Sequence, residues 1–426
     1  MMTGGGMTTV AVGADPAVAR RRAIEALRAG VPSRDAVAAT GSGQAAIEDS
    51  FASLRAAAAA GHPGGLLLGG GFGAGKSHLL EHLARLAIDA GFTVSRVVIS
   101  KETPLHDPAK VFAAAAESAV MAGHPRPAIM EAAAVIDPDG RAYAELLRWA
   151  TSTGSGLNER FAATLALFAQ VRQRDPAFAN TIVRFWSGDP IATPELRRRL
   201  KEIGEARPSL PPVAVRELGV QRLRFAAKLL AAAGSAGWVI FFDEVELIGR
   251  YSLQQRARSY AEIVRWVRGE HGSPGVPIAA VLAMTDDFEA AVITGRNDRE
   301  LLPERLRAKQ TPEATALAAA AVQGMRIIDR EMQLLTPPDE AELTQAYARL
   351  KELHGEVFGW LPPDVGGLER LGATRMRQYV RTWINEWDLL RLDPSFRPDT
   401  EVVDVSSDYR EDPDLETSEG IAAPDA

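Results

Sequence analysis

The chain has 426 residues, 46% of them hydrophobic, and a formal net charge of −7 at pH 7. This length and composition predict a globular protein with a sizeable core and two or three domains or subdomains. No apolar run approaches the roughly 18 residues that cross a bilayer, and residues 1–14 lack the charged-then-apolar order of a signal peptide. The chain has no cysteine, which excludes disulfides and thiolate metal sites. We therefore expect a cytoplasmic protein without a membrane segment.

Charge is distributed unevenly along the chain. Residues 399–426 carry ten acidic residues and one basic residue, a charge of −9 that leaves about +2 on residues 1–398. Because apolar anchors are few there, residues 396–426 are predicted to form a disordered acidic tail. A tail of this kind either keeps the protein soluble or docks on a basic partner or surface, and the sequence leaves both alternatives open.

The N-terminal part leads into a first strand. Residues 1–15 are rich in Gly and Thr and are predicted to be flexible, and a basic helix is expected over residues 16–28. The break Gly30-Val31-Pro32 follows, and a second helix is expected from about Gln44 to Ala60. The short apolar run at residues 64–69 then fits a buried strand.

A phosphate-binding loop follows this strand. Residues 70–77 read G-G-F-G-A-G-K-S, a full match to G-x-x-x-x-G-K-[ST], and leucines at helical spacing follow from Ser77 to Ala90. Glycines let successive backbone N–H groups point at the β-phosphate, while Lys76 reaches the β- and γ-phosphates and the Ser77 hydroxyl ligates Mg²⁺. The predicted nucleotide-binding residues here are Gly71, Phe72, Gly73, Ala74, Gly75, Lys76, Ser77 and His78. The histidine side chains are interpreted as structural, since none has acidic partners at ligand spacing.

A second half of the site is predicted much further along the chain. Residues 93–100 fit a central strand, and a section without strand signals then extends from Pro108 to Leu230. We interpret its middle, at about residues 120–215, as a helical insertion. Residues 238–244 read W-V-I-F-F-D-E, an apolar strand that ends in two acids, as in a Walker B motif. Asp243 is predicted to hold Mg²⁺, and Glu244 to orient and deprotonate the attacking water.

A further strand is expected at residues 277–284, ending in Thr285-Asp286-Asp287. A polar side chain at the tip of a strand beside Walker B can read the γ-phosphate, so Thr285 is the favoured sensor and Asp286 the alternate. The same polar residues also fit a turn or cap that starts the next helix.

Together these residues resemble the AAA+ ATPases. Within that class the chain is similar to the BREX-type ATP-binding proteins of phage-defence islands, BrxD-like, and more distantly to the origin-recognition initiators. The stretches that carry the resemblance are Arg21 to Pro32 with Gly43-Gln44, Gly70 to Ser77, Phe241 to Glu244, and Arg375 to Arg381. The resemblance implies an α/β fold, with a P-loop AAA+ core and parallel sheet at residues 16–305, the helical insertion, and a C-terminal helical lid at residues 306–395.

The resemblance also implies further site residues and partners. Val31 and Pro32 would border the adenine, and Arg377, with Arg375 next, would be the lid arginine that contacts the phosphates. A neighbouring subunit of a homo-oligomer would supply an arginine finger, for which Arg305 and Arg307 lead over Arg296 and Arg299. The partner would be a helicase or another defence-system protein.

Nonspecific DNA contact remains an alternative for two basic stretches, which otherwise form ordinary solvated helix faces. They are Arg197 to Lys201, and Arg216, Arg222, Arg224 and Lys228. The sequence thus predicts an Mg²⁺-dependent ATPase that controls a DNA-acting partner. The competing hypotheses are a scaffold that assembles on ATP with little hydrolysis, and a motor that itself translocates DNA.

Overall fold

A computed structural model describes residues 15–31, 33–124, 126–204, 210–365, 376–396 and 409. The chain divides into two compact units. The helical unit contains Met1–Gly43, Gly73–His82 and Pro337–Asp404. The sheet unit contains Gln44–Phe72, Leu83–Thr336 and Val405–Ala426. Among the described residues, no helix is long and apolar enough to cross a membrane.

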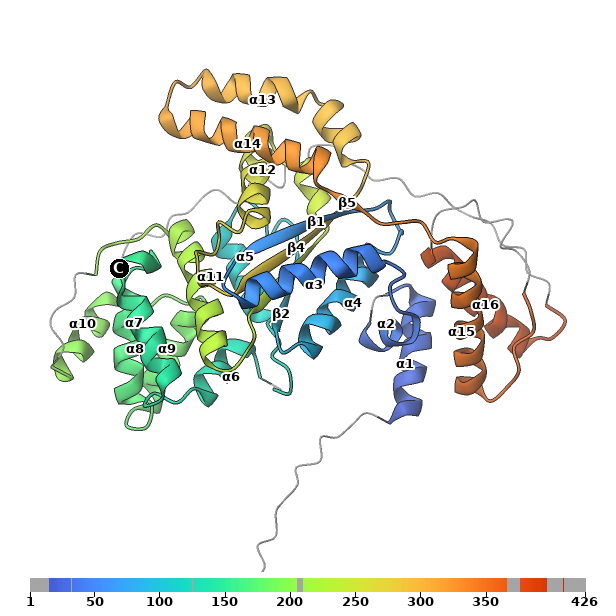
Figure 1. Cartoon of the computed structure of the whole chain (residues 1–426), viewed down its shortest axis with the longest axis horizontal. Coiled ribbons are helices and arrows are strands. Elements are labelled where there is room, and N and C mark those ends of the chain that lie inside the picture. The colour runs from blue at the N-terminus through green and yellow to red at the C-terminus, as the bar shows by residue number, and fades with distance from the viewer. Residues whose placement is uncertain are drawn as a thin grey trace, which may run out of the picture. The chain divides into compact units, whose positions relative to one another are not determined.

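The sheet unit is built on one parallel sheet with strand order β2-β3-β4-β1-β5 (Figure 1). The strands are β1 (Gly64–Gly69), β2 (Thr93–Val98), β3 (Trp238–Asp243), β4 (Ile278–Met284) and β5 (Gln333–Leu334). The first four lie where the sequence predicts them, whereas β5, with only two residues, carries no recognisable pattern. The α/β class with a parallel sheet is confirmed, and it is consistent with a P-loop AAA+ fold.

Helices cover both faces of this sheet, which explains why its central strands are almost wholly apolar. The neighbouring residues Phe241 and Phe242 of β3 point to opposite faces, as successive strand residues do. Phe241 packs on Phe51 of α3 (Ala45–Ala59), with 5.8 Å between ring centroids. Phe242 packs on Trp266 of α12 (Leu253–Val267), at 4.8 Å. The sheet edge that carries the predicted site is therefore held between two helical layers.

Between β2 and β3, every described element is a helix. The α-helices are α5 (Pro108–Glu117), α6 (Ala128–Val135), α7 (Arg141–Thr151), α8 (Glu159–Val171), α9 (Pro176–Ser187), α10 (Thr193–Glu202) and α11 (Val215–Ala232). An aromatic cluster joins α8, α9 and α11, since the ring of Phe225 lies 4.9 Å from Phe161 and 5.4 Å from Trp186. The helical section thus has a core of its own.

The remaining helices of the sheet unit follow β3. They are the 3₁₀ turn Val245–Arg250, α12, the π-helix Glu289–Thr294, α13 (Asp298–Arg307) and α14 (Pro312–Arg330). Helix α14 lies so close to α12 that a Cβ on Gly324 would collide with the carbonyl oxygen of Tyr260. Helix α14 therefore belongs to the sheet unit, and the helical lid at residues 306–395 stays a prediction.

The helical unit contains α1 (Pro16–Ala29), α2 (Arg34–Thr40), α15 (Glu340–Phe358), α16 (Met376–Leu392) and the first residues of α4 (Lys76–Asp89). Its core is aromatic, with Tyr347 of α15 lying 5.2 Å from Trp383 and 5.4 Å from Trp387. An ion pair of 2.7 Å between Arg28 and Asp388 links α1 to α16. The N-terminal helix α1 therefore packs on α16, far away in sequence.

Candidate nucleotide-binding site

The glycine loop connects β1 to α4, which begins at Lys76. Gly73 and Gly75 have φ values of 81° and 106°, in the left-handed region that glycine adopts without steric cost. The N–H of Gly70 donates to the carbonyl oxygen of Met284 at 3.2 Å, which fixes the start of the loop to the end of β4. The order of strand, glycine loop and helix is the one that a phosphate-binding loop needs.

Three neighbouring strands end at the same edge as this loop. Gly69 of β1 pairs with Met284 of β4, and Phe242 of β3 pairs with Leu282 of β4. The acids after β3 and the polar residues after β4 therefore flank the first part of the loop, at the carboxyl edge where open α/β sheets bind ligands.

Asp286 is the polar residue of this edge that borders the loop. Its two carboxylate oxygens lie 3.8 and 3.9 Å from the position that a Cβ on Gly71 would occupy. The sequence leaves Asp286 as the alternate to Thr285, and the structure places it against the loop backbone. A side chain at Gly71 would enter the space between the loop and this carboxylate.

The two acids of the Walker B pattern have distinct environments. Asp243 Oδ1 accepts the N–H of Glu244 at 3.0 Å, and Oδ2 has no hydrogen bond among the described residues. The side chain of Glu244 is exposed, and its backbone has φ 58° and ψ 34°, a left-handed conformation. This conformation costs a non-glycine residue roughly 1–3 kcal/mol, and such strain clusters at functional sites. The strained turn motivates the assignment of a role to Glu244.

Thr285 is 1% exposed, and its hydroxyl is hydrogen-bonded to the hydroxyl of Tyr409. Tyr409 also donates to Asp287 Oδ1 at 2.7 Å. The sequence analysis missed Tyr409 because it lies in the acidic tail. Its one available signal is that it is the only aromatic residue in residues 399–426.

The helix that follows the loop places Lys76, Ser77 and His78 in its first turn, and Lys76 is 9% exposed. The His78 ring donates from Nε2 to the Gly41 carbonyl at 2.9 Å, and the same nitrogen lies 3.1 Å from Thr40 Oγ1. Burial lowers the pKa of His78, and the nearby charge of Arg377 adds to this. The His78 side chain is therefore neutral at pH 7 and ties α4 to the end of α2, as a structural histidine does.

Arg377 lies on α16 within the same unit, close enough to influence the protonation of His78. Its side chain packs on Gly30, where a Cβ would lie 3.5 Å from Arg377 Cδ. Val31 is 58% exposed and follows directly. Arg377 and Val31 therefore both lie near Gly30. Two other predicted residues, Pro32 and Arg375, fall outside the described residues. So does the predicted acidic tail, apart from Phe396 and Tyr409.

The metal prediction rests on Ser77 and Asp243. No group of three or more His, Asp or Glu side chains among the described residues is arranged to hold a metal ion. A magnesium ion that accompanies a nucleotide takes one or two protein ligands, with the remaining positions filled by phosphate oxygens and water. A serine hydroxyl beside a glycine loop and a carboxylate with one unused oxygen are oxygen ligands of the right kind for that arrangement.

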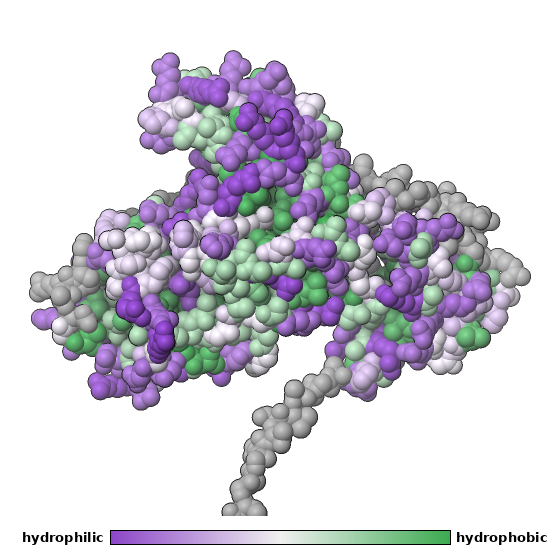
Figure 2. All heavy atoms as spheres, viewed as in Figure 1, coloured by the Kyte–Doolittle hydropathy of each residue, from purple (hydrophilic) through white to green (hydrophobic). Residues whose placement is uncertain are grey.

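The two leading arginine-finger candidates lie at the end of α13. Arg305 and Arg307 are exposed and have no ion-pair partner among the described residues, whereas Arg299 pairs with Glu289 at 2.6 Å. The surface over α13 and α14 is largely hydrophilic in Figure 2. Arg305 and Arg307 can therefore form ion pairs with another molecule, whereas Arg299 already forms one within its own chain.

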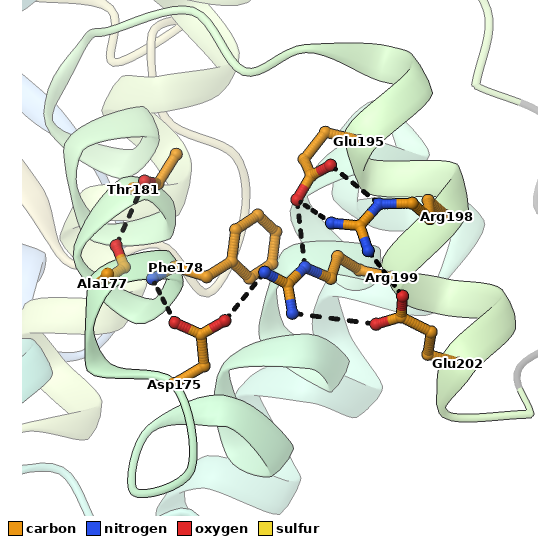
Figure 3. Close-up of polar contacts among 8 residues, drawn as sticks. All are labelled: Asp175, Ala177, Phe178, Thr181, Glu195, Arg198, Arg199 and Glu202. Atoms are coloured by element: carbon orange, nitrogen blue, oxygen red, sulfur yellow. Dashed lines mark hydrogen bonds and ion pairs between the residues drawn. The ribbon is translucent and has the colours of Figure 1, made fainter.

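The first basic stretch is partly neutralised within the helical section (Figure 3). Arg198 pairs with Glu195 and Glu202, each at 2.7 Å. Arg199 pairs with Asp175 at 2.8 Å and with Glu195 at 3.0 Å, and its guanidinium lies 4.5 Å from the ring centroid of Phe178. These contacts hold α10 against the start of α9. They neutralise Arg198 and Arg199, whereas Arg197 and Lys201 of the same stretch are exposed and take no part in these contacts.

The second basic stretch, on α11, is also used internally. Arg216 pairs with Glu262 at 2.8 Å, and Arg224 and Lys228 donate to backbone carbonyls of residues 270–275. Arg222 donates to the Asp189 carbonyl at 2.6 Å, and burial lowers its pKa to about 10. The prediction of a solvated face is wrong for Arg222, which is 6% exposed. These contacts do not favour a phosphate-binding track on α11.

Comparison with known proteins supports the resemblance that the motifs suggest. Residues 16–137 match the family model described as BREX system ATP-binding protein BrxC/D. The matched segment contains the basic N-terminal helix, the glycine loop and β2, so the similarity to BrxD-like ATP-binding proteins is confirmed over this part of the chain. No curated protein and no solved structure matches the chain.

Proposed function

We propose that the chain is an Mg²⁺-dependent ATPase that works in the cytoplasm as part of a phage-defence system. The observation that carries the proposal is the common edge of β1, β4 and β3, where the glycine loop, Asp286 and the Asp243-Glu244 pair converge. The family match, to proteins described as ATP-binding, supports ATP as the nucleotide.

In the proposed mechanism the γ-phosphate is transferred to water. Glu244 orients the water and accepts its proton as the oxygen attacks phosphorus, and the bond to the β–γ bridging oxygen breaks. Lys76 neutralises charge on the β- and γ-phosphates. Ser77 and Asp243 would hold a magnesium ion, which when bound would withdraw charge from the phosphate oxygens. Arg377 is the arginine proposed to add positive charge at the phosphates.

The nucleotide state would then control a partner. In this proposal the protein forms homo-oligomers, with Arg305 or Arg307 of one subunit completing the site of the next, because both are exposed and unpaired among the described residues. The partner would be a DNA-acting, helicase-like protein of the same defence system. Because most side chains of the basic stretch on α11 are used in internal contacts, that stretch does not support the alternative that the protein itself is the translocating motor.

The test is steady-state phosphate release with and without DNA. Lys76→Ala is expected to abolish ATP binding, and Glu244→Gln to retain binding while lowering turnover by at least about 10²-fold. Glu246→Gln, two residues further along, is the matched control and should keep wild-type turnover.

Unchanged turnover in Glu244→Gln would show that Glu244 does not position the water. Near-zero turnover of the wild type with ATP-dependent oligomers would favour the scaffold, and strong stimulation by DNA alone would favour the motor.

A further inference from the structure

Tyr409 makes a specific contact at the tip of β4. Its hydroxyl is hydrogen-bonded to Thr285 Oγ1 and donates to Asp287 Oδ1 at 2.7 Å. Its ring meets Phe288 edge to face, with 6.0 Å between centroids and an interplanar angle of 85°. A residue more than 120 positions away in sequence thus covers the side chain that the sequence analysis assigns as the γ-phosphate sensor.

The Tyr409 ring packs closely against Gly249 and Phe288. Gly249 has no side chain, and a Cβ there would lie 3.1 Å from Tyr409 Cδ1 and 3.1 Å from Phe288 Cε2. Such distances are shorter than ordinary van der Waals contact, so any larger residue at Gly249 would displace the tyrosine ring or Phe288. Tyr409 thus has apolar contacts around its ring and two hydrogen-bond partners for its hydroxyl.

Counting protons shows what this contact does to Thr285. A tyrosine hydroxyl has one proton, and here it goes to the Asp287 carboxylate, which can only accept. In the bond between the two hydroxyls Thr285 must therefore be the donor. A threonine that senses a γ-phosphate has to donate that same proton to a phosphate oxygen. The Tyr409 contact and the sensor contact exclude each other.

We propose that Tyr409 is an autoinhibitory contact, which occupies Thr285 and must be displaced for ATP to be bound there. This inference rests on the proposed function, because it assumes that Thr285 faces the γ-phosphate.

The first test compares Tyr409→Phe, which keeps the ring and removes the hydroxyl, with the wild type. The KM for ATP is expected to fall about 5- to 30-fold, because the hydroxyl makes two hydrogen bonds that are each worth about fivefold. The kcat should stay unchanged, because saturating ATP displaces Tyr409 in both proteins. Tyr143→Phe is the control: it removes a buried hydroxyl that donates to the Leu165 carbonyl at 2.6 Å in the helical section. That change should leave KM unaltered.

The second test follows the displacement directly. Because the chain has no cysteine, Ser407→Cys can carry a single fluorophore. A non-hydrolysable ATP analogue is expected to lower the fluorescence anisotropy of the label, and the Tyr409→Ala background should show the low value without nucleotide. Anisotropy that does not respond to the analogue in a protein that binds it would overturn the inference.

The outcomes separate this inference from the proposed function. If wild type and Tyr409→Phe bind ATP with the same KM, autoinhibition is wrong and the ATPase proposal stands. If Tyr409→Phe lowers kcat, the hydroxyl positions Thr285 for catalysis and the inference is also wrong. If the wild type binds no ATP but Tyr409→Phe does, autoinhibition is supported. Failure of both proteins to bind ATP refutes the proposed function and, with it, any competition at Thr285.

Discussion

Asp298 closes a buried ionic network that holds α13 against α12. Its two carboxylate oxygens accept hydrogen bonds from Arg256 Nε and Nη2, each at 2.8 Å, and the Tyr260 hydroxyl donates to Oδ2 at 2.9 Å. Arg256 is 2% exposed and Asp298 is fully buried. The network fixes the first residue of the helix that carries Arg305 and Arg307 at its other end.

Replacing Asp298 by Asn keeps the volume and removes the negative charge. The guanidinium of Arg256 then stays buried without the negative charge of Asp298. The amide nitrogen that replaces one carboxylate oxygen cannot accept a hydrogen bond from the guanidinium. Breaking a buried pair in this way costs about 3–5 kcal/mol, a large share of the roughly 5–15 kcal/mol that separates folded from unfolded protein. Urea denaturation followed by tryptophan fluorescence is expected to show a correspondingly lower midpoint for the sheet unit.

The matched control is Arg299→Ala on the same helix. It removes an ion pair of 2.6 Å with Glu289, but both side chains are partly exposed, so the expected loss is below about 1 kcal/mol. Replacing the pair by apolar residues, Arg256→Met with Asp298→Leu, should recover only part of the lost stability, because the Tyr260 hydroxyl and the Tyr251 carbonyl oxygen each lose a hydrogen-bond partner. Equal effects of Asp298→Asn and Arg299→Ala would refute the reasoning, because burial would then not determine the cost.

Three further predictions concern charge elsewhere in the molecule. Burial alone would raise the pKa of Glu262, but its contacts with His271, Arg265 and Arg216 lower that pKa to about 2. The ionised carboxylate therefore contributes about 3 kcal/mol to the free energy of unfolding above pH 4.5, and this contribution is lost as the pH falls toward 2. The free energy of unfolding of Glu262→Gln should therefore vary less over this pH range than that of the wild type. Arg377→Ala should lower kcat/KM for ATP about 10- to 100-fold, and an unchanged value would remove its phosphate role. Arg305→Ala with Arg307→Ala should lower kcat about 10³-fold without changing ATP affinity, and full activity in dilute monomers would contradict a finger supplied by a neighbouring subunit.

The sequence by itself determined four of the five strands and the motif residues proposed for the site. Apolar runs mark β1 and β3, and the glycine loop and the Asp243-Glu244 pair are read at fixed offsets from these strands. Such features are local, since each depends on residues within one turn or one strand. The long helical section between β2 and β3 could also be predicted, because strand signals are missing over its whole length.

Only the tertiary structure decided which polar groups meet at the site and which charges are free. The register of β1 on β4 brings Asp286 to Gly71, and the fold brings Tyr409 to Thr285. Arg222 reads as a surface residue on an amphipathic helix, yet α11 buries it against Phe185. Each of these pairs is separated by tens to hundreds of residues, and their contacts depend on how helices pack on the sheet, which no local pattern of residues specifies.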